Sequence, residues 1–343
     1  MADVLKRAYR RVVPLPVREV IWQIRQRALR SKIARPEDSG QDPYPERSAV
    51  LAAYAQFRTP KILTLPHDYS VGVPAIDRLD LADATLKELG PEGKNWLSGR
   101  LRELGVNVQP YRIDVNAFRE YWRAARYDEA SPDYYGGNYV LFRTEKALEH
   151  FLSVELLRLQ PGQVYIDVAS SKSVVPEIFH RLFGVKVYRQ DLTYPDGIHE
   201  DTIGGDAASM PVPDAFADAM ALHCSFEQFE GDSDIRFIIE TQRVLKPGGR
   251  LCILPLYLRP NYTLRTDPLV AVAESVDLGA EGIIVAIPRS NVRFARLYTP
   301  EKFVARVAKH CGDLSLTVYD VTNHREVDPN TYVEYAAVFR KPE

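Results

Sequence analysis

The chain of 343 residues exceeds the usual size of one compact domain, so its length predicts a full domain plus a sizeable appendage. Its hydrophobic fraction of 45% and charged fraction of 26% are ordinary for a globular protein, and no apolar run is long enough to span a membrane. A net charge of −2 provides no field that would hold a nucleic-acid backbone, so composition argues against nucleic acid as the main partner.

Positive charge is concentrated at the start of the chain, where residues 1–35 hold many arginines and lysines but only the acids Asp3 and Glu19. Apolar residues interleave with these charges, so a basic helix there would either pack on the domain behind it or lie on an anionic membrane surface. The polar run PEDSGQDPYP that follows contains proline and glycine, which indicates a linker. We therefore assign residues 1–45 to a basic N-terminal arm and linker. The expected location is cytoplasmic, with peripheral contact to the inner membrane through residues 1–35 left open.

Helical patterns dominate the next segment, residues 46–130. Apolar periodicity predicts helices over residues 47–57, 79–89, 95–104 and 113–125. The segment contains no catalytic cluster and no internal repeat. We predict a mostly helical accessory region that serves as a lid or a substrate platform.

From residue 140 onward, apolar runs typical of strands alternate with helical runs, which is the pattern of a parallel sheet with crossover helices. The predicted strands are 164–168, 185–188, a short strand near Ile203, 217–223 and 250–256, and the predicted helices are 144–159, 174–183, 234–245 and one that begins at Thr299. This order predicts an α/β fold, a doubly wound Rossmann-like sheet over residues 131–343.

Acidic residues follow the first three predicted strands of this domain. Ligands of open α/β sheets bind at the carboxyl ends of the strands near the switch in strand order. Asp167 ends the first strand and precedes the small residues 169–173, while Asp191 lies at the end of the second. An acid at the second position can accept hydrogen bonds from both ribose hydroxyls of an adenosine. Asp206, after the third strand, is placed to receive the exocyclic amine of adenine.

The sequence resembles the class I S-adenosylmethionine-dependent methyltransferases from Gln163 to the end of the chain. The resemblance is carried by the order and spacing of these acids and by the heptad RVLKPGG, residues 243–249, before a strand. It implies S-adenosylmethionine as the cofactor and a Rossmann-like methyltransferase sheet. In the family the first acid helps to place the methionine part, the second holds ribose, and the third with its neighbour contacts adenine. The matching positions here are Asp167, Asp191, Asp206 and Ala207.

The loop after the first strand departs from the family, because Ala169, Ser171 and Ser173 replace its glycines. Where the backbone requires positive φ, each replacement costs about 1 kcal/mol or more. Glycine would let the loop backbone come closer to the cofactor. The hydroxyls of Ser170 and Ser171 would compensate in part by hydrogen-bonding the cofactor's carboxylate. The other expected cofactor contacts are Ala169, Leu192 and Arg143, the last as a partner of the methionine carboxylate.

Two other functions compete with methyl transfer. A nicotinamide dehydrogenase also uses a strand, a small-residue turn and a later acid. However, Asp167 would then direct a carboxylate at a pyrophosphate, and Val174 occupies the place of the third glycine. The replaced glycines leave open a methyltransferase fold that has lost catalysis and serves as a binding or scaffold subunit.

Methyl transfer to a hydroxyl requires alignment of the acceptor and removal of its proton. His223 and Glu227 lie at and just past the tip of the predicted strand 217–223 and are the candidate bases, although His223 would equally line the methionine pocket. No cysteine or histidine motif indicates a metal site. The sequence leaves the oligomeric state open.

The segment between Tyr257 and Thr299 is an insertion that is well placed to shape the acceptor site. Its polar residues include Arg259, Tyr262, Arg265, Arg289 and Arg293. Arginines suit an acceptor that carries phosphate or carboxylate, such as a nucleotide- or lipid-linked sugar, although solvated charges would explain them as well. The predicted function is O-methylation of a small molecule or glycan.

Overall fold

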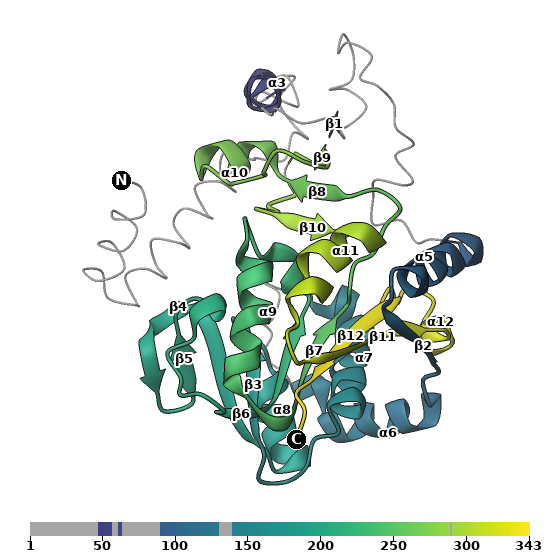
Figure 1. The fold of residues 1–343 in the computed structure, drawn as a ribbon, viewed down its shortest axis with the longest axis vertical. Helices are drawn as coiled ribbons and strands as arrows, with labels where there is room; N and C mark the ends of the chain where they lie inside the picture. Colours follow the sequence, from purple (N-terminus) through teal and green to yellow (C-terminus); the bar gives the residue numbers. More distant parts are fainter. Residues whose placement is uncertain (1–46, 57–60, 64–89, 130–138, 289) are drawn as a thin grey trace.

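A computed structural model describes residues 47–56, 61–63, 90–129, 139–288 and 290–343 (Figure 1). The predicted basic arm, residues 1–45, and the predicted helix 79–89 lie outside these ranges. The described residues form a large eight-stranded sheet covered by helices and a small four-stranded sheet beside one end of it. Among the described helices, none combines the length and the apolar character needed to cross a membrane.

The large sheet has the strand order β2-β11-β12-β7-β6-β3-β4-β5. Its strands are β2 (Asn107–Tyr111), β3 (Val164–Val168), β4 (Lys186–His199), β5 (Thr202–Gly204), β6 (Ala217–His223), β7 (Leu245–Leu254), β11 (Ser315–Val321) and β12 (Tyr335–Arg340). All neighbours run parallel except β12, which is antiparallel to both β7 and β11. The chain runs outward from β3 to β5 and then returns to β6 on the other side of β3. The switch point at β3 and β6 confirms the predicted doubly wound fold.

Helices cover both faces of the large sheet because neighbouring strand residues point to opposite sides. Tyr165 packs on Phe179 with ring centroids 5.2 Å apart, whereas Ile166 joins the apolar cluster on the other face. The first face carries α6 (Val115–Ala125), α7 (Tyr139–Leu157) and α8 (Val175–Phe183). The second face carries α5 (Pro91–Glu103), α9 (Ser233–Val244) and α11 (Pro300–Arg306). The remaining short helix of the large domain is α12 (His324–Val327).

Part of the predicted accessory region belongs to the large sheet. Strand β2 pairs in parallel with β11, with Asn107 opposite Thr317. Helix α5 is tied to the same strand, because Lys94 Nζ lies 2.8 Å from Asp320 Oδ1 and Ser98 donates a hydrogen bond to Asp320. The predicted division of the chain at residues 45 and 130 stays a prediction, but the large sheet begins before residue 131.

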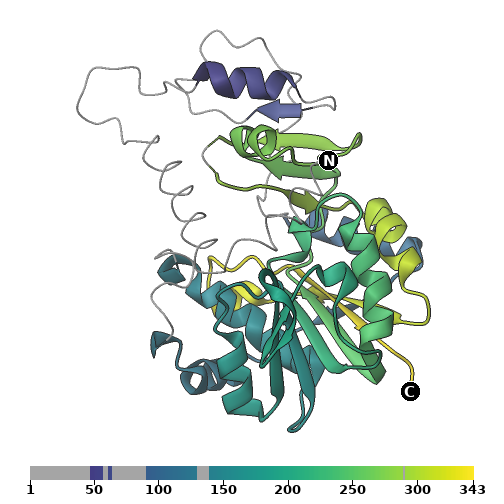
Figure 2. The ribbon, with the colours of Figure 1, turned by 90° about the vertical axis from the view of Figure 1, so that its left-hand side faces the viewer.

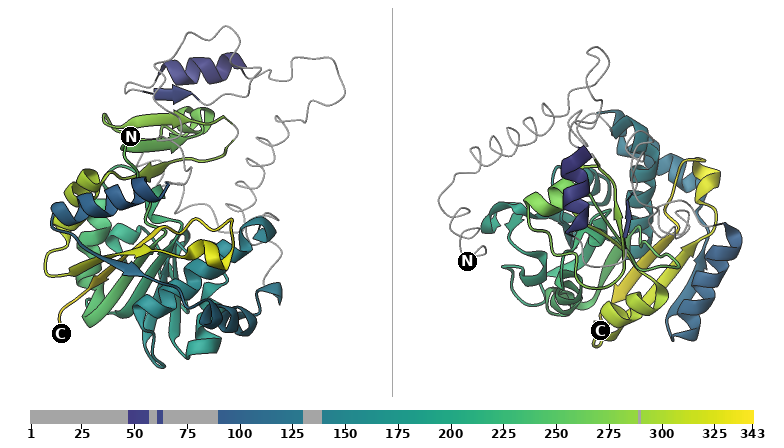
Figure 3. Two further views of the ribbon diagram at one scale, coloured as in Figure 1. Left: turned by 90° about the vertical axis from the view of Figure 1, so that its right-hand side faces the viewer. Right: turned by 90° about the horizontal axis from the view of Figure 1, so that it is seen from above.

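The small sheet and its helices form a cap, which we define as residues 47–56, 61–63 and 258–298. Its strands are β1 (Lys61–Leu63), β8 (Thr263–Thr266), β9 (Ile283–Ala286) and β10 (Ala295–Leu297), in the order β1-β9-β8-β10. Helices α3 (Arg47–Ala55) and α10 (Pro268–Ala273) lie side by side on it. Figures 2 and 3 show this cap stacked over one end of the large sheet. The insertion after β7 and the N-terminal part of the chain therefore build one unit.

Several predicted elements are confirmed and others differ in extent. Strands β3 and β6 have the predicted bounds, whereas β4 continues to His199, well past the predicted end at Tyr188. Helix α11 begins after Thr299, which agrees with the predicted helix start, and the Thr299 side chain caps it by accepting a hydrogen bond from the Lys302 backbone N–H. Helices α3, α5 and α6 correspond to three of the four predicted in the accessory region.

Candidate functional site

The loop after β3 has the backbone geometry of a glycine-rich turn without the glycines. Ala169 and Ser171 have φ values of 53° and 45°, in the left-handed region. Such a conformation costs a residue with a side chain about 1–2 kcal/mol, and it persists only where the surroundings impose it. Here β4 imposes it, because the Ala169 N–H donates to Gln190 Oε1 at 3.1 Å and the Ser171 N–H donates to Asp191 Oδ2 at 2.9 Å. The backbone is thus left-handed at two of the three positions where the resemblance expects glycine.

Asp191 lies within β4, just past the point where β4 stops pairing with β3, and is buried against this loop. Besides the Ser171 N–H, its carboxylate accepts hydrogen bonds from the backbone N–H and the hydroxyl of Thr193, both at 2.9 Å. A carboxylate has about four acceptor positions, so three of them are taken and little capacity remains for a ligand. The neighbouring Leu192 is 50% exposed and lies beside the expected adenosine site.

Asp206, after β5, lies near the same edge of the sheet and is held by two groups. Its Oδ1 accepts a hydrogen bond from Ala208 N–H at 2.9 Å and caps the short helix η4 (Ala207–Ser209), while Oδ2 pairs with Arg236 at 3.2 Å. Ala207 is buried. The tips of β4 and β5 are joined, because Gln190 Nε2 donates to the Gly205 carbonyl at 2.7 Å. The structure thus brings the predicted second and third acids to adjacent strand ends.

Asp167 and His223 meet at the switch point between β3 and β6. The Asp167 Oδ1 atom accepts a hydrogen bond from the Tyr165 hydroxyl and lies 3.2 Å from His223 Nδ1. His223 Nε2 lies 3.0 Å from Ser153 Oγ, so both ring nitrogens are engaged by the protein. The second carboxylate oxygen of Asp167 is buried and has no hydrogen-bond partner among the described residues. His223 therefore has the geometry of a group that orients Asp167 rather than that of a free base.

A buried polar face of α7 lines the same region, and the sequence analysis missed it. Its members are Glu145, Lys146, Glu149, His150 and Ser153. Lys146 Nζ lies 2.7 and 2.9 Å from the two oxygens of Glu149, and Glu149 Oε1 accepts the Cys224 thiol at 3.3 Å. Glu145 Oε1 and His150 Nε2 are buried without a hydrogen-bond partner in the described part of the chain. Burial lowers the pKa of His150 well below its ordinary value, which keeps this ring neutral.

The polar face of α7 had a signal in the sequence. Glu145, Glu149 and Ser153 recur every fourth residue, between the apolar pairs Ala147-Leu148 and Phe151-Leu152. A polar stripe within an otherwise apolar helix indicates buried polar groups that need partners.

Arg143, on the first part of the same helix, lies with its guanidinium over the Trp122 ring at 5.1 Å.

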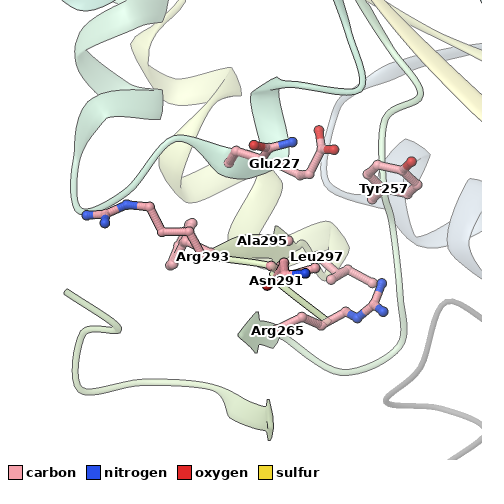
Figure 4. Close-up of a pocket in the computed structure, with 10 residues that line it drawn as sticks. Glu227, Tyr257, Arg265, Asn291, Arg293, Ala295 and Leu297 are labelled. Atoms are coloured by element: carbon pink, nitrogen blue, oxygen red, sulfur yellow. The ribbon is translucent and has the colours of Figure 1, made fainter. Parts of the chain in front are cut away.

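A cavity of about 290 Å³ separates the large sheet from the cap (Figure 4). Glu227 of the short helix η5 (Phe226–Gln228) and Tyr257 line the side of the large sheet. The opposite side is lined by Arg265 of β8, by Leu297 of β10 and by Asn291, which precedes β10. Strand β10 also lies next to η5, so the cap closes directly over the residues that follow β6.

Glu227 is a half-buried residue with one fully buried carboxylate oxygen. Its Oε2 atom is inaccessible to water and has no hydrogen-bond partner among the described residues. Burial is the main cause that raises the pKa of Glu227 to about 7, and the charge of Glu149 adds to it. A carboxyl group with this pKa is partly ionised at neutral pH, which is the range in which a general base works best. Of the two predicted bases, Glu227 has the suitable geometry.

The arginines of the insertion have different surroundings. Arg259 is buried and pairs with Glu334 at 3.0 Å. Arg293 lines the cavity but pairs with Glu230 and Glu274, each at 2.6 Å. Arg289 lies outside the described residues. Arg265 also lines the cavity, and its Nε is buried without a hydrogen-bond partner in the described structure.

Comparison with known families identifies the large domain. Residues 172–253, from the loop after β3 to the end of β7, match the family described as a methyltransferase domain. This segment of the chain is therefore similar to a methyltransferase domain. No curated protein matches the chain. Within the described residues, no cluster of His, Cys, Asp and Glu is arranged to hold a metal ion.

Solved structures resemble this chain weakly. The Burkholderia thailandensis 1,6-didemethyltoxoflavin-N1-methyltransferase, solved with S-adenosylhomocysteine, is 15% identical with a TM-score of 0.42, over 68% of this chain and 94% of its own. The geranyl diphosphate C-methyltransferase from Streptomyces coelicolor A3(2) is 13% identical with a TM-score of 0.37, over 74% of this chain and 98% of its own. The family match and the sheet topology, rather than these likenesses, identify the domain.

Proposed function

We propose that this protein binds S-adenosylmethionine at the carboxyl ends of β3, β4 and β5 and methylates a hydroxyl oxygen of a small molecule or glycan. The residues that would hold the cofactor are Asp167, Ala169, Ser170, Ser171, Asp191, Leu192, Asp206 and Ala207. The Oδ2 of Asp167 is buried and has no hydrogen-bond partner among the described residues, so it fits the ammonium group of the cofactor, because a buried carboxylate oxygen needs a donor. Asp191 retains about one acceptor position for a ribose hydroxyl. When bound, the cofactor supplies an electrophilic methyl group on a sulfonium.

The observation that carries the proposal is Glu227, which lines the cavity under the cap and has a buried carboxylate oxygen with no hydrogen-bond partner among the described residues. In our proposal its carboxylate takes the proton of the acceptor hydroxyl. Burial raises the pKa of the Tyr257 phenol well above its ordinary value, so this group stays protonated and can donate a hydrogen bond to the acceptor. His223 keeps Asp167 oriented, and the cap excludes water from the reacting groups.

Arg143, on the first part of α7 with its guanidinium over the Trp122 ring, remains a proposed partner of the methionine carboxylate. We retain the proposal that residues 1–35 make a peripheral contact with an anionic membrane. The proposed division of the chain is into residues 1–45, 46–130 and 131–343.

Calorimetric titration with S-adenosylhomocysteine tests cofactor binding, and transfer of labelled methyl from S-adenosylmethionine to a panel of hydroxylated acids and sugars tests the reaction. Glu227→Gln should bind S-adenosylhomocysteine like the wild type but lose about 10²–10⁴-fold in transfer rate. Wild-type transfer should rise with pH around an apparent pKa of about 7, because the ionised form is the base. Glu120→Gln, on the exposed side of α6, is the matched control.

Absence of S-adenosylhomocysteine binding to the wild type would overturn the proposal and favour a fold that has lost catalysis. Transfer that survives in Glu227→Gln with an unchanged pH profile would remove Glu227 as the base. Methylation of nitrogen or carbon acceptors alone would refute the O-methylation part.

A further inference from the structure

Arg265 is a cation without a counterion in the described part of the chain. It lies on β8 of the cap, and its Nε is buried with no hydrogen-bond partner. No ion pair joins it to any described acid, although Glu227 lines the same cavity. Burial lowers the pKa of Arg265, which reflects the loss of hydration around its charge. Arg293, on the same cavity wall, has two carboxylate partners.

An arginine without a partner in a partly buried place destabilises the folded protein, because water no longer compensates its charge. A protein gains from such a residue when a ligand supplies the missing partner. The guanidinium group is planar and presents its donors as a fork that matches the two oxygens of a carboxylate or phosphate. The charge and the position of Arg265 therefore indicate an oxyanion as the absent partner.

We propose that Arg265 binds an oxyanion, carboxylate or phosphate, of the methyl acceptor, which is accordingly a compact hydroxylated acid. The identification of this anion as the acceptor depends on the function proposed above, whereas the binding of an anion does not. Arg265 and Glu227 lie on opposite walls of the cavity, so an acceptor held by its anion at the cap presents its other end to Glu227. The cavity volume of about 290 Å³ is at the lower end of ligand sites. This size favours a single-ring acid over a nucleotide- or lipid-linked sugar.

Calorimetric titration of the full chain with three probes tests the proposal: inorganic phosphate, benzoate, and benzamide as the neutral counterpart of benzoate. The wild type should bind at least one of the two anions and should bind benzamide more weakly than benzoate. Arg265→Gln should weaken anion binding by about tenfold or more, as expected for loss of a charged hydrogen-bonded pair. Arg265→Lys keeps the charge but not the forked arrangement of donors, so its anion affinity should lie between those of the wild type and Arg265→Gln. Arg293→Gln is the matched control, with anion affinity within about threefold of the wild type.

Melting temperature provides a second readout. Since the charge of Arg265 has no carboxylate partner among the described residues, Arg265→Gln should melt at or above the wild-type temperature, which would show that the variant folds. The proposal is overturned if the wild type binds neither anion, or if Arg265→Gln keeps wild-type anion affinity. Equal losses in Arg293→Gln and Arg265→Gln would also overturn it. S-adenosylhomocysteine titration of the same variants separates the two proposals, because Arg265 variants should keep cofactor affinity even where they lose the anion.

Discussion

Glu227→Gln should make the protein more stable at neutral and alkaline pH while it removes the proposed base. The wild-type carboxyl has an ordinary pKa of 4.5, and burial raises it to about 7 in the folded protein. Glutamine has nearly the same shape and never ionises. The substitution therefore removes the ionisation and leaves the packing almost unchanged.

The sign and size of the effect follow from proton linkage. Below pH 4.5, Glu227 is protonated in both the folded and the unfolded chain, so wild type and variant should have similar stability. As pH rises toward 7, the unfolded chain releases its proton and the folded protein retains it, so wild-type stability falls. A shift of this size corresponds to about 3 kcal/mol. Above pH 7 the variant should exceed the wild type in free energy of unfolding by up to that amount, or roughly 6 °C in melting temperature.

Urea unfolding at about pH 5, 6, 7 and 8.5, followed by tryptophan fluorescence, measures the difference between the two proteins. Glu120→Gln serves again as the control, because its side chain is exposed and the substitution should leave the pH dependence as in the wild type. The reasoning is refuted if the difference between Glu227→Gln and wild type is the same at every pH. It is also refuted if the variant is the less stable protein at pH 8.5, which would mean that the ionised carboxylate has a stabilising partner.

Three further predictions concern other parts of the site and its support. His223→Gln should keep methyl transfer within about tenfold of the wild type, since glutamine can still bond Asp167; a greater loss than in Glu227→Gln would identify His223 as the base. Asp234→Ala should lower the free energy of unfolding by about 3–5 kcal/mol, because it removes the buried carboxylate that pairs with two arginines. Arg296 and Arg306 lie 2.7 and 2.6 Å from this carboxylate. A change below about 1 kcal/mol in urea unfolding would contradict this prediction. Ser171→Gly should stabilise the protein by roughly 0.5–1 kcal/mol by relieving the φ of 45°, and a loss of stability would show that the hydroxyl matters more than the backbone.

The sequence predicted the parts of the fold that depend on local pattern. Strands β3 and β6 are buried on both faces, so their apolar runs are continuous and their ends are marked by Asp167 and His223. The positions of the three acids followed from the ends of β3, β4 and β5. The extent of β4 did not follow, because Leu192, Tyr194 and Asp196 lie in a partly exposed extension beside β5 that has no apolar alternation.

Long-range pairing explains what the sequence did not predict. Strand β2 pairs with β11, and β1 pairs with β9, each across a long stretch of chain. The local sequence of β1 or β2 therefore does not predict which strand it pairs with. The same limit applies to the site. Arg259, Arg265 and Arg293 look alike in the sequence. Only the folded chain distinguishes the two that pair with carboxylates from Arg265, which pairs with none among the described residues.

Both sheets of the protein end in a strand from the first third of the chain, since β1 is the outer strand of the cap and β2 that of the large sheet. A shortened protein that starts at residue 131, where the predicted catalytic domain begins, would lose both strands together. The inner neighbours β9 and β11 would then present unpaired backbone N–H and C=O groups to other molecules, a common route to aggregation. Recombinant work on the catalytic domain should therefore retain the chain from residue 47 onward.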